Sequence, residues 1–140
     1  MKNLIQKTIS PGTHDKLSAI GLLILRVTLG GVMLFAHGGG KLVNFADVSS
    51  KFPDPLGVGS PLSLGLAVFA EVFCAIAIML GLFTRAAAVP LLITMLVAAF
   101  IVHGDDPFKK QEFALLYAVP FLALILTGPG RYSIDQKLGR

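Results

Sequence analysis

Four long apolar segments dominate this chain, and each is about as long as a helix that crosses a membrane. They run over residues 18–37, 61–83, 86–102 and 110–127. A helix needs roughly 17–25 apolar residues to cross the ~30 Å hydrocarbon core of a bilayer. None of the four has the broad polar face that a surface helix of a water-soluble bundle requires. The sequence therefore predicts an all-α membrane protein, a bundle of four transmembrane helices with both termini on the same side.

The composition supports a single membrane domain. Hydrophobic residues make up 54% of the 140 residues and charged residues only 14%, whereas soluble domains are about a quarter charged. We expect a cytoplasmic N-terminal segment over residues 1–17, a transmembrane domain over 18–127 and a cytoplasmic C-terminal tail over 128–140. The net charge is +4, but no basic cluster is interleaved with aromatic residues, so we expect no nucleic-acid partner.

The distribution of positive charge predicts the orientation in the membrane. Seven lysines and arginines lie in the two termini and in the connection between the second and third segments, against four in the other two connections. Lysine and arginine concentrate in the cytoplasmic loops of membrane proteins. Both termini are therefore expected in the cytoplasm, with residues 41–60 and 104–109 outside.

Arg26 and Glu71 are the two charges that fall inside the first and second apolar segments. Counted from the expected outer ends of these segments, both lie at a depth of roughly 15 Å. A charge at mid-membrane costs about 2.5–3.5 kcal/mol on insertion scales, and an arginine–carboxylate pair relieves that cost. The sequence predicts an Arg26–Glu71 pair, either as a structural lock between two helices or as part of a substrate or proton site.

Two histidines and a second glutamate extend this candidate site towards the outer surface. Arg26 and His37 share one face of the first helix, His103 ends the third helix, and Glu112 begins the fourth. The candidate ligand or proton site therefore comprises Arg26, His37, Glu71, His103 and Glu112. Each histidine is also consistent with a cap near the C-terminal end of its helix. We expect no metal site, because these groups come from separate helix ends and Cys74 is the single cysteine.

Five short motifs carry a family resemblance over residues 17–135. They are Leu25-Arg26 with Gly30-Gly31, His37-Gly38 with Lys41-Leu42, Ala70-Glu71, the stretch 80–85 and the stretch 127–135. With these motifs the chain resembles the DoxX family of small four-helix bacterial membrane proteins. The resemblance implies a multi-pass protein of the bacterial cytoplasmic (inner) membrane. It also implies a link to quinones, because named members are connected with thiosulfate:quinone oxidoreduction, quinone detoxification and thiol-oxidative-stress complexes.

Three functions are compatible with the sequence and this resemblance. The first is a quinone-associated redox or redox-stress subunit, surrounded by membrane lipid, that acts with a partner oxidoreductase subunit or as a homo-oligomer. The second is a non-enzymatic scaffold or assembly subunit with Arg26–Glu71 as an internal lock. The third, conduction of a solute or proton, needs oligomerisation because one four-helix bundle leaves little room for a pore. Whether the chain is itself an enzyme stays open, and no catalytic residue is assigned.

Overall fold

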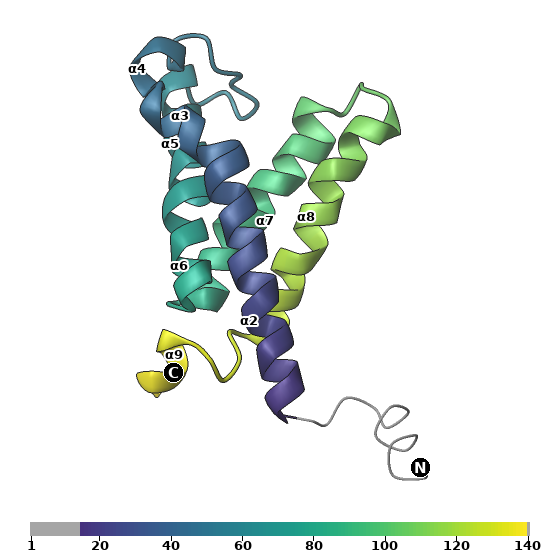
Figure 1. Cartoon of the computed structure of the whole chain (residues 1–140). Coiled ribbons are helices and arrows are strands. Elements are labelled where there is room, and N and C mark those ends of the chain that lie inside the picture. Colours follow the sequence, from purple (N-terminus) through teal and green to yellow (C-terminus); the bar gives the residue numbers. More distant parts are fainter. Residues whose placement is uncertain (1–14, 140) are drawn as a thin grey trace.

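Four long helices form the protein, and the computed structural model describes residues 15–139 (Figure 1). Three of these helices contain a wider π-helical stretch, labelled η. The first two run through α2 (Asp15–Val32), η1 (Met33–Gly38) and α3 (Gly39–Val43), and through α5 (Ser60–Val68), η2 (Phe69–Cys74) and α6 (Ala75–Leu80). The other two are α7 (Thr84–Val97) with η3 (Ala98–Val102), and α8 (Phe108–Thr127). Two short helices, α4 (Phe45–Val48) and α9 (Ile134–Lys137), lie in the first connection and near the C-terminus.

All four long helices are long and apolar enough to cross a membrane. They comprise Lys16–Val43, Ser60–Leu80, Thr84–Val102 and Phe108–Thr127. The predicted all-α, four-span fold is therefore confirmed. The start of α2 and the C-terminal helix α9 lie at one end of the bundle, and the connection that carries α4 lies at the other (Figure 1). We call these the terminal end and the loop end.

The first helix is longer than the sequence predicted. The first apolar segment was predicted to end at His37, just before the glycine run 38–40, but the helix continues to Val43. Glycine weakens helices in water, yet a chain inside a membrane has no water to satisfy free backbone groups, so the helical hydrogen bonds persist. The end of this helix at the loop end is thereby displaced by six residues, which is about 9 Å.

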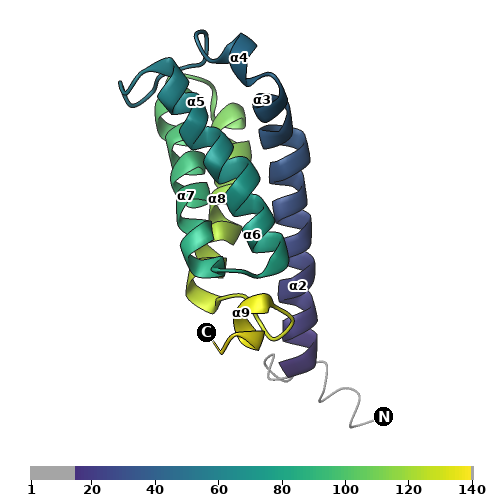
Figure 2. The ribbon, with the colours of Figure 1, turned by 90° about the vertical axis from the view of Figure 1, so that its left-hand side faces the viewer.

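Small residues bring the first two long helices close together. A Cβ atom added to Gly30 of α2 would lie 2.5 Å from Cγ of Met79 and 2.7 Å from the carbonyl oxygen of Ala75, both on α6. Close backbone approach of this kind is how membrane helices gain packing energy. Figure 2 shows α2 and α6 side by side. The largest fully buried apolar side chains of the bundle come from all four helices: Met33, Leu64, Ile78, Leu91, Phe121 and Leu124.

The connection at the loop end folds back onto the bundle. Phe45, Val48 and Phe52 of this connection pack against a buried apolar cluster on the second helix, formed by Leu64, Val68 and Val72. The connection therefore covers one side of the second helix.

Candidate functional site

Arg26 is fully buried near the terminal end of the bundle and binds backbone carbonyl groups there. Its Nη1 donates to the carbonyl oxygens of Ile78 at 3.0 Å and Met79 at 3.3 Å, and its Nη2 donates to that of Tyr132. The carbonyls of the last helical turn lack intrahelical partners and carry partial negative charge. Arg26 thus satisfies the C-terminal end of α6 and ties it to the C-terminal segment.

The predicted Arg26–Glu71 pair is wrong. Arg26 lies at the level of Ile78 and Met79, seven to eight residues beyond Glu71 on the second helix, which corresponds to roughly 11 Å. The extension of the first helix to Val43 explains the error, because it places Arg26 deeper below the loop end than the sequence reasoning assumed.

Glu71 instead pairs with Lys41. Nζ of Lys41, on α3, lies 2.5 Å from Oε2 of Glu71, on η2, and the glutamate side chain is only 5% exposed. Gly38 lies three residues before Lys41, and a Cβ there would be 2.7 Å from the carbonyl oxygen of Glu71. The ring of Phe52 lies beside the ammonium group, 5.9 Å from Nζ to the ring centroid. The missing side chain of Gly38 thus lets the two helices approach closely enough for the ion pair.

A cavity of about 480 Å³ opens beside this ion pair, between the second and third long helices and under the connection at the loop end. We call it the Lys41–Glu71 pocket. Its walls are mainly apolar and include Phe52, Pro53, Leu56, Phe69, Ile93 and Val97. Ligand pockets generally have this size and an apolar lining with a few polar groups. Leu66, Phe69 and Ile93 line it and are about half exposed, so the pocket reaches the lipid-facing surface.

Asp54 fixes the connection that covers this pocket. Its Oδ1 accepts hydrogen bonds from Ser63 Oγ at 2.7 Å and from the Val58 amide at 2.9 Å, and its Oδ2 accepts one from the Gly59 amide at 2.8 Å. The hydrogen bond from Ser63, followed by that from Gly59, lowers the pKa of Asp54 below its usual value. The carboxylate thereby attaches the connection to the first turn of α5.

Removing this carboxylate should loosen the connection. Since its pKa is lower in the folded protein, the stabilisation by Asp54 is present above the ordinary carboxyl pKa of about 4 and is lost as the pH falls through the folded value. We expect Asp54→Ala at neutral pH to raise amide hydrogen exchange at Val58 and Gly59 several-fold. The wild type should approach the variant only below about pH 4. Asp105→Ala, in the other connection at the loop end, should leave these amides unchanged, and equal exchange in all three proteins would contradict the role of Asp54.

The other predicted site residues do not line the Lys41–Glu71 pocket. The His37 ring makes an edge-to-face contact with the ring of Tyr117, with centroids 5.7 Å apart. His103 bonds through Nδ1 to Asp106 at 2.7 Å, which lowers the pKa of that carboxyl group. Glu112 is exposed. Of the five predicted residues only Glu71 lines the pocket.

The outer mouth expected from His37, His103 and Glu112 does not form as one cluster. Tyr117, the partner of His37, lies nine residues into α8, about 14 Å from its start. His37 is therefore well below the end of the bundle where His103 lies. Within residues 15–139, no group of three or more His, Cys, Asp or Glu side chains is arranged to hold a metal ion.

Sequence reasoning missed Lys41 and Asp135. Lys41 was assigned to the outer connection because the first helix was ended too early. Asp135 was assigned to the C-terminal tail, but it is 5% exposed, and its two oxygens accept the amides of Phe83 and Thr84 at 2.8 and 2.9 Å. Its own amide donates to the Gly81 carbonyl at 2.9 Å. The sequence signal for the role of Asp135 was the pair of family motifs at 80–85 and 127–135, which the fold brings into contact.

Comparisons with known proteins agree with this architecture. Residues 21–104 match the model of the DoxX family. The inner membrane protein YqjF of Escherichia coli is 29% identical over 131 residues, which cover 89% of this chain and 97% of that protein. An uncharacterised protein of Haemophilus influenzae is 34% identical over 123 residues, covering 83% of this chain and 89% of its own length. No solved structure is significantly similar. With more than half of its length matched by the family model, the chain belongs to the DoxX family and is an integral membrane protein.

Proposed function

We propose that this protein binds a quinone in the Lys41–Glu71 pocket and acts as the quinone-binding membrane subunit of a partner oxidoreductase. The observation that carries the proposal is the ion pair of buried Glu71 with the partly exposed Lys41, beside an apolar cavity that reaches the lipid-facing surface. Ionisable groups inside a membrane are costly and typically mark ligand or proton sites. We favour a ligand site over a purely structural role for the Lys41–Glu71 pair, because apolar residues stabilise helix contacts as well as a buried ion pair does.

The chemistry of the pocket suits a quinone head group. Quinone carbonyl oxygens accept hydrogen bonds, and the Lys41 ammonium has three donors, of which the contact with Glu71 uses one. The isoprenoid tail leaves the pocket past Leu66, Phe69 and Ile93 into lipid. Reduction of a quinone takes up two electrons and two protons. A partner protein supplies the electrons, and Glu71 is placed to exchange protons with the bound head group.

Quinone titration of purified protein in detergent tests this proposal. We expect saturable binding of a short-tailed quinone by the wild type. Lys41→Met should weaken binding about tenfold or more, because a hydrogen bond to a charged group contributes roughly 1.5–3 kcal/mol. The double variant Lys41→Met with Glu71→Gln removes both charges, so it should fold without a stranded buried charge and still bind poorly.

The matched control is Lys51→Met, which makes the same change at an exposed position of the connection at the loop end. It should bind quinone as the wild type does. If no variant differed from the wild type, or if the wild type showed no saturable binding, the scaffold function would be favoured instead.

We further propose that the protein lies in the bacterial inner membrane with its terminal end in the cytoplasm. The excess of lysine and arginine at the terminal end supports this orientation. The name of the E. coli relative, an inner membrane protein, supports the location.

A further inference from the structure

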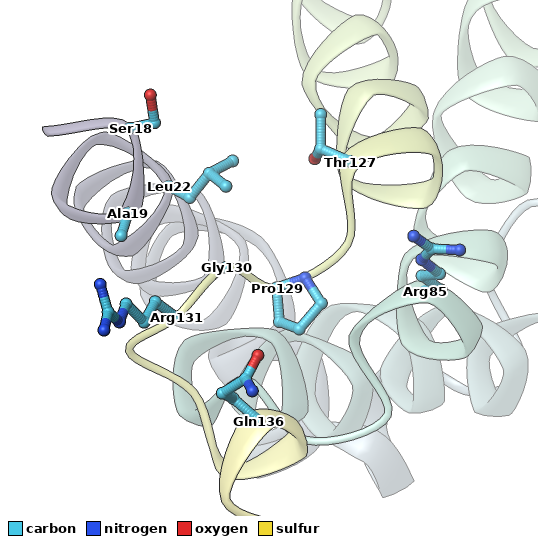
Figure 3. Close-up of a pocket in the computed structure, with 9 residues that line it drawn as sticks. All are labelled: Ser18, Ala19, Leu22, Arg85, Thr127, Pro129, Gly130, Arg131 and Gln136. Atoms are coloured by element: carbon cyan, nitrogen blue, oxygen red, sulfur yellow. The ribbon is translucent and has the colours of Figure 1, made fainter. Parts of the chain in front are cut away.

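A second cavity, of about 550 Å³, lies at the terminal end of the bundle (Figure 3). We call it the terminal pocket. It opens between the first turns of α2, the start of α7, the end of α8 and the connection that follows α8. Among its nine lining residues, all in the part of the chain that the structure describes, two are arginines and none carries a carboxylate. The terminal pocket therefore has a positive lining.

Arg85 is held in place at one side of this pocket. Its Nη2 is 3.5 Å from the carbonyl oxygen of Leu126. Its guanidinium group lies against Gly128, where an added Cβ would be 3.1 Å from Nε and 3.3 Å from Nη2. Gly128 also has a φ of +77°, a backbone conformation that glycine adopts without strain. The turn after α8 thus makes room for the arginine, which keeps most of its five N–H donors free for a ligand.

Arg131 lies on the opposite side of the terminal pocket, and Gln136 lies between the two arginines in Figure 3. Arg131 is exposed. The nearby carboxylate of Asp135 accepts the amides of Phe83 and Thr84 and does not line the pocket. Ser18 and Ala19, in the first two turns of α2, also line the pocket, and the N-terminal end of a helix carries partial positive charge.

The depth of the terminal pocket matches the headgroup region of a bilayer. The membrane-crossing segments begin or end beside it, at Lys16, Thr84 and Thr127. Its lining also includes the apolar residues Ala19, Leu22 and Pro129, which suit the glycerol and first methylene groups of a lipid. Basic pockets between membrane helices at this level bind anionic headgroups.

We propose that the terminal pocket binds a phosphate group through Arg85 and Arg131, and that an anionic phospholipid supplies this phosphate. Guanidinium groups match phosphate oxygens in charge and geometry, and arginine forms paired hydrogen bonds with them. The site is separate from the Lys41–Glu71 pocket, which lies towards the other end of the bundle, so it does not depend on the proposed quinone function.

Lipid retention by the full chain tests this proposal. The protein is purified in detergent with mixed phosphatidylglycerol and phosphatidylcholine, and the retained lipids are counted by native mass spectrometry. We expect preferential retention of phosphatidylglycerol by the wild type. Arg85→Gln and Arg131→Gln should each reduce this preference about fivefold, since a basic residue at a membrane surface contributes roughly 1 kcal/mol to binding of anionic lipid. Lys51→Gln and Lys109→Gln, which remove the same charge at the loop end, should leave the preference unchanged.

A parallel titration with inorganic phosphate distinguishes the two sources of the phosphate group. Saturable phosphate binding that is lost in the Arg85→Gln, Arg131→Gln double variant would support the pocket with a free phosphate as its ligand. The proposal is overturned if the wild type shows neither phosphate binding nor a preference for phosphatidylglycerol. It is equally overturned if the double variant matches the loop-end controls in both measurements.

Discussion

Replacing Arg26 with alanine should destabilise the protein by about 3 kcal/mol or more, because it strips a buried hydrogen-bonded charge from its site and leaves a cavity. The guanidinium group is 0% exposed and bonds to the carbonyls of Ile78, Met79 and Tyr132. Without it, the carbonyls of Met79 and Tyr132 lose Arg26 as their donor, and the carbonyl of Ile78 keeps only the Gly81 amide, at 3.0 Å. The midpoint of thermal unfolding in detergent is the measurement.

Two further variants test whether this loss of stability depends on the shape of the guanidinium group and on its burial. Arg26→Lys keeps the positive charge but presents one compact ammonium group in place of a planar fork, so it should recover only part of the loss. Arg85→Ala removes an exposed arginine at the same end of the bundle and should cost much less. If Arg26→Ala unfolded at the same temperature as Arg85→Ala, the structural role of Arg26 would be refuted.

The number and order of the membrane spans were predictable because they depend on local composition. An apolar run of sufficient length forms a helix in a membrane whatever its neighbours are, since its backbone groups must bond to one another. The end of the first helix was not predictable from glycine propensity, which is measured in water. That error of six residues carried into the site, because it set the wrong level for Arg26 and left Lys41 outside the bundle.

The candidate site was therefore predictable in chemistry but not in pairing. The buried charge of Glu71 followed from its place in an apolar segment, and so did its need for a cation. Which cation it meets depends on the relative heights of two helices, and this is a tertiary property. The contacts of Asp135 with Phe83 and Thr84 join residues about fifty positions apart, and neither of the two motifs that contain these residues indicates the contact by itself.

The glycine run 38–40 permits a test in which the same substitution should have opposite outcomes at two positions. An added Cβ at Gly38 would lie 2.7 Å from the carbonyl oxygen and 2.8 Å from the carbonyl carbon of Glu71. An added Cβ at Gly40 would meet no atom of a neighbouring element within 4 Å. Backbone atoms cannot turn aside as the end of a flexible side chain does. Gly38→Ala should therefore force η1 and η2 apart and cost about 1–3 kcal/mol of stability, as overpacking generally does. Gly40→Ala should be neutral or stabilising by up to about 1 kcal/mol, because alanine is the better helix former.

The same pair of variants links packing to the proposed ligand site. Separation of the helices at Gly38 lengthens the Lys41–Glu71 contact, because Lys41 lies one helical turn beyond Gly38 and Glu71 is the residue that Gly38 touches. Gly38→Ala should thus weaken quinone binding and lower the unfolding temperature. Gly40→Ala should neither weaken quinone binding nor lower the unfolding temperature. Equal unfolding temperatures for the two variants would show that the helices do not approach closely at Gly38. A destabilised Gly38→Ala protein that bound quinone with wild-type affinity would place the ligand away from the ion pair.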